Sequence, residues 1–341
     1  EDATWINKLI DGNTLAGLFP RSSFLVLGVT LQQFLAYQLA DNYNTYILFK
    51  TLFSLATILL VAGTFLFNNL LPIYCRYFLF FALAIPITSD INDEVFGHLH
   101  NLVWYFPIAL FNLSFAVWSL IKKFLLNKDE NWSVYILMSL LGVGGVLFPL
   151  CTLVNILFFL SVALYTYVFN LYGSSNKRKS VRIYILALSN LSFNLTILIN
   201  SSERVNSIIN STIEDKNITV LNHIEFISRQ ISGIFAYAPS YSIDTIYTVA
   251  IKFLIAISIL FLYLRLGFVL INEFNNKKPN FENWDKIIPL IYATLLPFAF
   301  LLVLYIKRID ELSYFLTDFK GNGYPNRYYI SSFYLFTINI C

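Results

Sequence analysis

Long apolar runs separated by short polar segments dominate the sequence, and they predict a series of membrane-spanning helices. Six runs are long enough for this role: 46–67, 101–121, 151–172, 182–199, 245–270 and 287–306. Weaker or shorter candidates lie at 22–40, 72–87, 134–149 and 329–341. Because a span needs about 20 mostly apolar residues, this pattern predicts an all-α polytopic integral membrane protein with about 8–10 apolar helices.

The composition also indicates that much of the chain is surrounded by lipid rather than by water. Of 341 residues, 57% are hydrophobic and 13% are charged, whereas a soluble globular domain carries about 25% charged residues. A net charge of +3, dispersed along the chain, does not favour nucleic acid as a partner. Three widely spaced cysteines, each in or beside an apolar run, are expected to be free thiols: Cys75, Cys151 and Cys341.

No linker divides the chain, so we predict a single transmembrane domain over 1–341. The sequence starts without a methionine and stops inside an apolar run, so we expect this domain to be incomplete at both ends. The long polar stretch 200–243 is predicted to form an outer loop or a lid over a cavity.

Positive charge predicts the orientation, because cytoplasmic loops are enriched in Lys and Arg. Three basic loops are placed in the cytoplasm: 122–132, 174–182 and 272–286. The acidic loop 88–100 has no Lys or Arg and is placed outside. If 134–149 and 151–172 form a helical pair, 200–243 and 307–328 also lie outside.

The N-terminal part does not fit this scheme directly. Three apolar segments separate Glu1 from the acidic loop, which would put the two on opposite faces. We expect segment 22–40, interrupted by Gln32 and Gln33, to insert only partly, so that both acidic regions face outward.

Four polar clusters are candidates for chemistry. They contain Glu1 and Asp2; Glu94, His98, Asn101 and Trp104; Arg204 and Arg229; and Arg327 with Tyr328. Acids at a membrane face can act as a general base or hold a cation, and arginines can bind phosphate. The alternatives are a solvated helix N-terminus for the first, a helix cap and aromatic belt for the second, a solvated loop for the third and interfacial snorkelling for the fourth.

A metal site at His98 and His100 is disfavoured, because residues two apart on a helix point to different sides.

Several short motifs occur in a recognisable order. They are Glu1-Asp2-Ala3, Pro20, Pro86 followed by Glu94-Val95, Asn101 with Trp104-Tyr105, Gly142 to Pro149, and Arg327-Tyr328-Tyr329. In this order the chain resembles bacterial polytopic membrane proteins related to the GT-C class of glycosyltransferases of surface-polysaccharide pathways. The chain departs from that pattern at Ser22–Leu25, which replaces Gly-Tyr-Leu, and in the longer distance from Pro86 to Glu94. The departures leave the substrate open.

The resemblance implies a GT-C-like fold in the bacterial inner membrane, with the active site on the outer face. The implied reaction moves a sugar from a polyprenyl phosphate or pyrophosphate to a cell-surface glycan or lipid acceptor. Asp2 would be the base with Glu1 as its alternate, Glu94 would face the same cavity, and Arg327 would neutralise the leaving phosphate. The remaining candidates would bind substrate: Tyr328, His98, Asn101, Trp104, Arg204 and Arg229.

Some members of the class use a divalent cation, and the sequence leaves that point open. Two other functions also stay open. One is a transporter or flippase for a lipid-linked or anionic solute, and the other is a non-catalytic membrane subunit of a larger complex.

Overall fold

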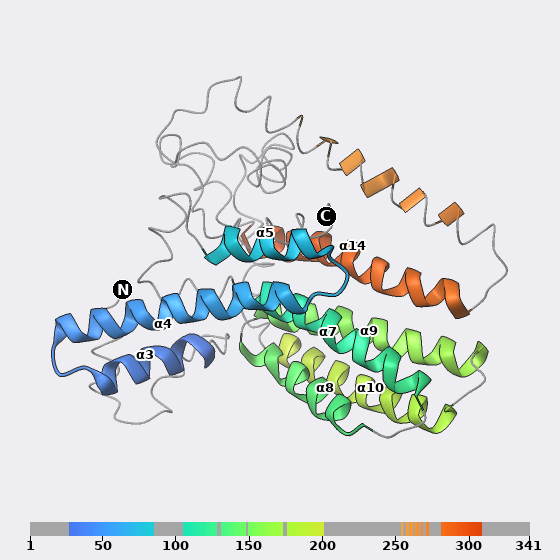
Figure 1. Cartoon of the computed structure of the whole chain (residues 1–341), viewed down its shortest axis with the longest axis horizontal. Coiled ribbons are helices and arrows are strands. Elements are labelled where there is room, and N and C mark those ends of the chain that lie inside the picture. Colours follow the sequence, from blue (N-terminus) through green and yellow to red (C-terminus); the bar gives the residue numbers. More distant parts are fainter. Residues whose placement is uncertain are drawn as a thin grey trace, which may run out of the picture. The chain divides into compact units, whose positions relative to one another are not determined.

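The computed structural model describes residues 27–84, 105–127, 131–147, 149–172, 176–200 and 281–308, with isolated helical positions between 254 and 272. Every regular element in these ranges is helical (Figure 1). Four helices are long and apolar enough to cross a bilayer: Tyr43–Phe67, Phe106–Leu126, Leu150–Leu171 and Lys177–Ile199. The described part of the chain is thus all-α, and its length and composition indicate a polytopic integral membrane protein.

The helices follow the predicted apolar runs. Their bounds are α3 Leu27–Leu39, α4 Tyr43–Thr64, η1 Phe65–Phe67, α5 Ile73–Ala84, α7 Phe106–Leu126, α8 Ser133–Val143, η3 Gly144–Leu147, α9 Pro149–Tyr172, α10 Lys177–Asn200 and α14 Phe281–Arg308. Weaker runs give the short helices α3, α5 and α8, of 13, 12 and 11 residues. The predicted span 329–341 lies outside the described residues, as does most of 245–270.

Three of the predicted boundaries are wrong by five or six residues. Helix α7 continues past Ile121 to Leu126, α10 begins at Lys177 instead of 182, and α14 begins at Phe281 instead of 287. All three extensions carry Lys or Arg, which the apolar pattern excludes from a span. The aliphatic parts of these side chains can lie along apolar surface while their charged groups reach water. The helix can therefore extend beyond the apolar run.

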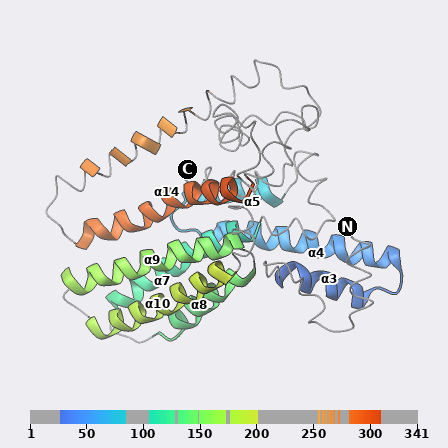
Figure 2. The ribbon, with the colours of Figure 1, turned by 180° about the vertical axis from the view of Figure 1, so that it is seen from behind.

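The chain forms two compact units. The first comprises residues 1–121, 131–156 and 189–202. Within it, α4 contacts both α3 and α5, and α3 runs beside α4 in both views (Figures 1 and 2). Asn42 begins α4 with a capping box, since its side chain accepts from Thr45 N while Thr45 Oγ1 accepts from Asn42 N.

A chain of buried polar groups connects the end of α4 to α7 in this unit. Asn68 Nδ2 donates to Asn112 Oδ1 at 2.9 Å, and Asn112 Nδ2 donates to Thr64 Oγ1 at 3.2 Å. Thr64 Oγ1 in turn donates to Val61 O at 2.5 Å. Both asparagine side chains are buried, and each has a hydrogen-bond partner within the protein. These bonds hold the turn between α4 and α5 against α7.

The second unit comprises residues 122–130, 157–188 and 203–341. Phe158 of α9 lies 5.8 Å from the Tyr292 ring of α14, and both side chains are buried. Ser180 of α10 donates to Thr166 O of α9 at 3.1 Å. Aromatic packing and cross-helix hydrogen bonds thus hold α9, α10 and α14 together in this unit.

The segment predicted to insert only partly contains α3. Its 13 described residues reach about 20 Å, short of the roughly 30 Å hydrocarbon core. Gln32 Nε2 donates to Thr57 Oγ1 of α4 at 2.9 Å, so this polar residue packs against a neighbouring helix. Residues 1–26 lie outside the described residues, and the shared outward placement of Glu1 and the acidic loop stays a prediction.

Cys75 and Cys151 are buried free thiols, which confirms the prediction for these two residues. Cys341 lies outside the described residues.

Candidate functional site

The residues assigned to the site from sequence all lie outside the described part of the chain. They are Glu1, Asp2, Glu94, His98, Asn101, Trp104, Arg204, Arg229, Arg327 and Tyr328. Their proposed roles stay predictions. The structure does describe the segments to which several of them are attached, and two polar clusters that the sequence did not single out as sites.

Tyr105, the last residue of the Asn101–Tyr105 motif, lies immediately before α7. Its side chain is only 2% exposed, and its carbonyl accepts hydrogen bonds from Ile108 N and Ala109 N at 3.1 and 3.2 Å. Burial raises the pKa of the Tyr105 hydroxyl well above its usual range. The motif therefore ends in a neutral, buried phenol immediately before the apolar helix α7.

The first cluster surrounds the break between α8 and α9, in the first unit. Helix α8 ends at Val143 and continues into the 3₁₀ turn η3, where Gly144 N donates to carbonyls of the last turn of α8. Asn155 Nδ2 donates to Leu141 O at 2.7 Å and to Gly142 O at 3.1 Å. Asn194 Nδ2 also donates to Gly142 O, at 3.1 Å. Side-chain amides from α9 and α10 thus give these carbonyls additional hydrogen bonds at the point where the α-helix ends.

Glycine is required for this approach. A Cβ at Gly142 would overlap Asn190 Oδ1, and a Cβ at Gly145 would overlap Asn194 Oδ1. The two glycines are three residues apart and the two asparagines four apart, so each pair shares one helix face. Close packing of small residues against hydrogen-bonding side chains is typical of helix interfaces in membranes.

The chemistry available in this cluster is neutral. Asn155, Asn194 and Thr152 have no exposed surface, and Thr152 Oγ1 donates to Gly145 O at 2.9 Å. Asn155 Oδ1 has no hydrogen-bond partner among the described residues. These amides can bind a polar group, but they cannot transfer a proton as a general acid or base.

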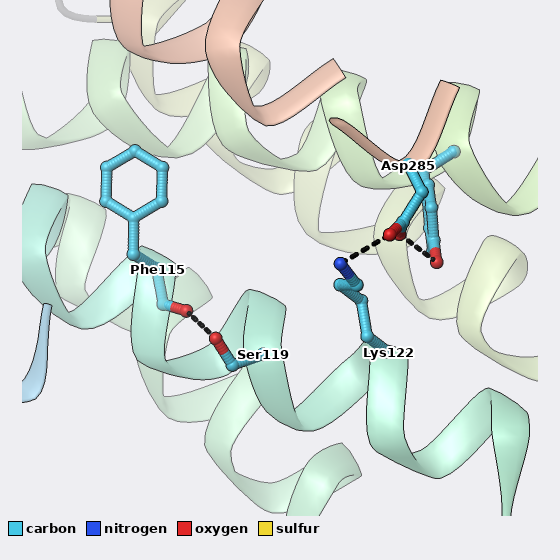
Figure 3. A network of polar contacts seen from close by, with 5 residues as sticks. Phe115, Ser119, Lys122 and Asp285 are labelled. Atoms are coloured by element: carbon cyan, nitrogen blue, oxygen red, sulfur yellow. Dashed lines mark hydrogen bonds and ion pairs between the residues drawn. The ribbon is translucent and has the colours of Figure 1, made fainter. Parts of the chain in front are cut away.

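The second cluster lies in the second unit and joins α7, α9 and α14. Lys122 Nζ is 2.5 Å from Asp285 Oδ2, and the Tyr165 hydroxyl donates to Asp285 Oδ1 at 2.9 Å (Figure 3). The Lys122 and Asp285 side chains are 33% and 21% exposed. Both carboxylate oxygens of Asp285 are occupied, so this acid connects three helices and is poorly placed to accept a substrate proton.

Nearby, Asn176 connects the start of α10 to the end of α7. It adopts a left-handed backbone conformation with φ of 57°, and its Nδ2 donates to Leu125 O and Asn127 O, both at 3.0 Å. Lys179 Nζ donates to Asn127 O at 3.1 Å. These donors cap the C-terminal carbonyls of α7, where positive charge is also favourable for the helix dipole.

Within the ranges that the structure describes, no group of three or more His, Cys, Asp or Glu side chains could hold a metal ion. The histidines and most of the acids lie elsewhere in the sequence, so a divalent cation stays untested.

The sequence contained a signal for the first cluster, namely asparagines four apart on an otherwise apolar stretch and glycines three apart on another. It contained none for the pairing of Lys122 with Asp285. In the comparisons with known proteins, the chain matches no protein-family model, no curated protein and no solved structure.

Proposed function

We propose that the chain is a membrane glycosyltransferase that moves a sugar from a polyprenyl phosphate or pyrophosphate to a glycan or lipid acceptor on the outer face of the bacterial inner membrane. The observation that carries this proposal is the continuity of α7. Its 21 residues span about 30 Å, close to the thickness of the hydrocarbon core. The acidic motif precedes one end of α7 and Lys122 and Lys123 lie near the other, so a spanning α7 puts them at opposite faces.

Two further helices support the same arrangement. Helix α10 runs from the basic residue Lys177 to Asn200, after which the segment containing Arg204 and Arg229 begins. Helix α14 runs from the Asp285 end to Arg308, and Arg327 follows. A helix that crosses a bilayer has its ends on opposite faces, so both segments would begin on the face of the acidic loop.

The described residues offer few alternative bases. Their acids are Asp41, Glu282 and Asp285, and Asp285 is engaged by Lys122 and Tyr165. Asp41 is exposed between α3 and α4. The base in this proposal is Asp2, with Glu1 as alternate, and Glu94 lies in the same cavity, as the resemblance implies.

The proposed step is a single displacement at the anomeric carbon. Asp2 accepts the proton of the acceptor hydroxyl, whose oxygen forms the new glycosidic bond. The bond between the anomeric carbon and the phosphate oxygen breaks, and the polyprenyl phosphate leaves with the electron pair. Arg327 stabilises the negative charge that develops on that leaving oxygen.

The test uses the full chain in liposomes, with a panel of undecaprenyl phosphates that carry different radiolabelled sugars and with cell-envelope glycans as acceptors. We expect at least one donor to lose its label to the acceptor fraction. Asp2→Asn should abolish transfer, while Asp41→Asn, which removes an acid outside the proposed site, should leave it unchanged. Normal transfer by Asp2→Asn, or no transfer from any donor, would contradict the proposal.

A transporter or flippase is the second candidate, and the α8–α9 break favours it. Interrupted helices lined by polar groups form substrate sites in many transporters, and here buried amides surround such an interruption. Movement of a fluorescent polyprenyl phosphate sugar between leaflets, with its glycosidic bond intact, would support this function over transfer.

A further inference from the structure

Helix α10 begins with an unusual concentration of positive charge. Lys177, Arg178, Lys179 and Arg182 lie in its first two turns, where the positive end of the helix dipole makes cations unfavourable. These residues therefore need compensation from neighbouring groups. Lys179 differs from Lys177 and Arg178 in how it obtains this compensation.

Lys179 is compensated from within the protein. Its side chain is 7% exposed, its Nζ donates to Asn127 O, and it lies 4.7 Å from the centre of the Phe124 ring. Lys177 and Arg178, by contrast, are exposed and form no ion pair with an acid among the described residues. Their partner is therefore not among the described residues, and the lipid around the helix can supply one.

The surface beside these two cations is apolar. Val181, Ile185 and Leu188 share a helix face with Arg178 by their spacing, and they are 45%, 58% and 37% exposed. Only 17% of the apolar stretch of α10 is buried, against 61% in α7 and in the apolar stretch Leu150–Leu171 of α9. This face of α10 is therefore available to lipid.

The distances along the helix match one lipid leaflet. From Leu188 to Arg178 the helix rises about 15 Å, which is half the hydrocarbon thickness. Acyl chains lying along Val181, Ile185 and Leu188 would therefore bring a headgroup to the level of Arg178 and Lys177. Lys and Arg at that level attract anionic headgroups, and arginine binds phosphate through two parallel hydrogen bonds.

We propose that this face of α10 is a binding site for an anionic phospholipid, with Lys177 and Arg178 on its phosphate-containing headgroup and Val181, Ile185 and Leu188 along its acyl chains. The site is independent of the sugar-transfer proposal, because it uses none of the same residues.

The test measures which lipid stays bound to the full chain. The protein is reconstituted in nanodiscs with equal amounts of phosphatidylglycerol and phosphatidylcholine. The lipids that stay bound after the protein is released from the nanodisc are counted by native mass spectrometry. We expect the wild type to retain phosphatidylglycerol preferentially. One cation at an anionic surface changes binding about fivefold, so K177Q/R178Q should reduce the preference by about 25-fold.

Two controls separate a site from general surface charge. K177R/R178K keeps both charges and should keep the preference, while Lys123→Gln removes an exposed charge from the end of α7 and should change it less than twofold. An unchanged preference in K177Q/R178Q, or an equal loss in Lys123→Gln, would overturn the proposal. If the double variant does not fold, the single variants Lys177→Gln and Arg178→Gln are measured instead. Each should reduce the preference for phosphatidylglycerol by about fivefold.

Discussion

Lys122 of α7 and Asp285 of α14 form an ion pair of 2.5 Å between segments far apart in the sequence. In the same unit, Asn176 donates to Leu125 O and Asn127 O at the end of α7. The end of α7 and the starts of α10 and α14 therefore meet. They belong to the three basic loops that the charge pattern assigns to one face of the membrane, and their meeting agrees with that shared assignment. Which face it is stays a prediction.

The ion pair gives the first test of stability. Lys122→Met leaves the half-buried Asp285 carboxylate without its cation, so we expect a loss of about 1–3 kcal/mol in unfolding free energy. Lys123→Met removes the neighbouring exposed cation and should cost less than about 0.5 kcal/mol. Unfolding of both variants in detergent micelles measures the difference. Equal losses would show that the pair contributes little beyond general charge.

The glycines at the α8–α9 break give a second, matched comparison. In Gly145→Ala the new methyl group would overlap Asn194 Oδ1, so we expect the interface to be pushed apart, with a loss of about 1–3 kcal/mol. Gly63→Ala in α4 meets no atom within 4 Å and should be neutral or stabilising by up to about 1 kcal/mol. Thermal unfolding measures both, and a neutral Gly145→Ala would exclude the tight packing seen here.

Much of the helical architecture follows from the sequence because apolar runs and spans share one cause, the transfer of side chains into lipid. The run 151–172 predicts α9 within two residues at its start and to the residue at its end. Pairings between distant residues have no such local signal. Tyr165 and Lys122 meet Asp285 only because three helices pack in one arrangement, and nothing near Asp285 in sequence indicates its partners.

The candidate site is a different case. Its residues were chosen because charge at the end of an apolar run is conspicuous, and all of them lie outside the described ranges. The Gly142 and Asn194 contact was missed because neutral amides and glycines change the hydropathy of a run very little. Their importance comes from hydrogen bonds across helices, which become visible only when the helices are packed.

The orientation of the bundle can be tested by labelling. In a background without the three native cysteines, Asn131→Cys lies in the basic loop 122–132 at an exposed position. We expect an impermeant maleimide to leave it unlabelled in intact cells and to label it after permeabilisation. Asp90→Cys in the acidic loop should be labelled in intact cells. Strong labelling of Asn131→Cys from outside would reverse the orientation, and with it the face of the proposed site.

The last prediction is that Asp2, Glu94 and Arg327 converge on one outer cavity. Each is a charged residue next to an apolar run, where an unpaired charge is costly, and bringing opposite charges together in a wet cavity offsets that cost. Cysteine pairs at positions 2 and 327, and at 94 and 327, should therefore react with a short bifunctional maleimide, whereas the pair at 41 and 327 should not. In the transfer assay, Arg327→Ala should weaken donor binding and turnover together, while Asp2→Asn should remove turnover and leave the donor bound. Failure of both predicted pairs to cross-link in a folded protein would place the three residues at separate surfaces and exclude a shared site.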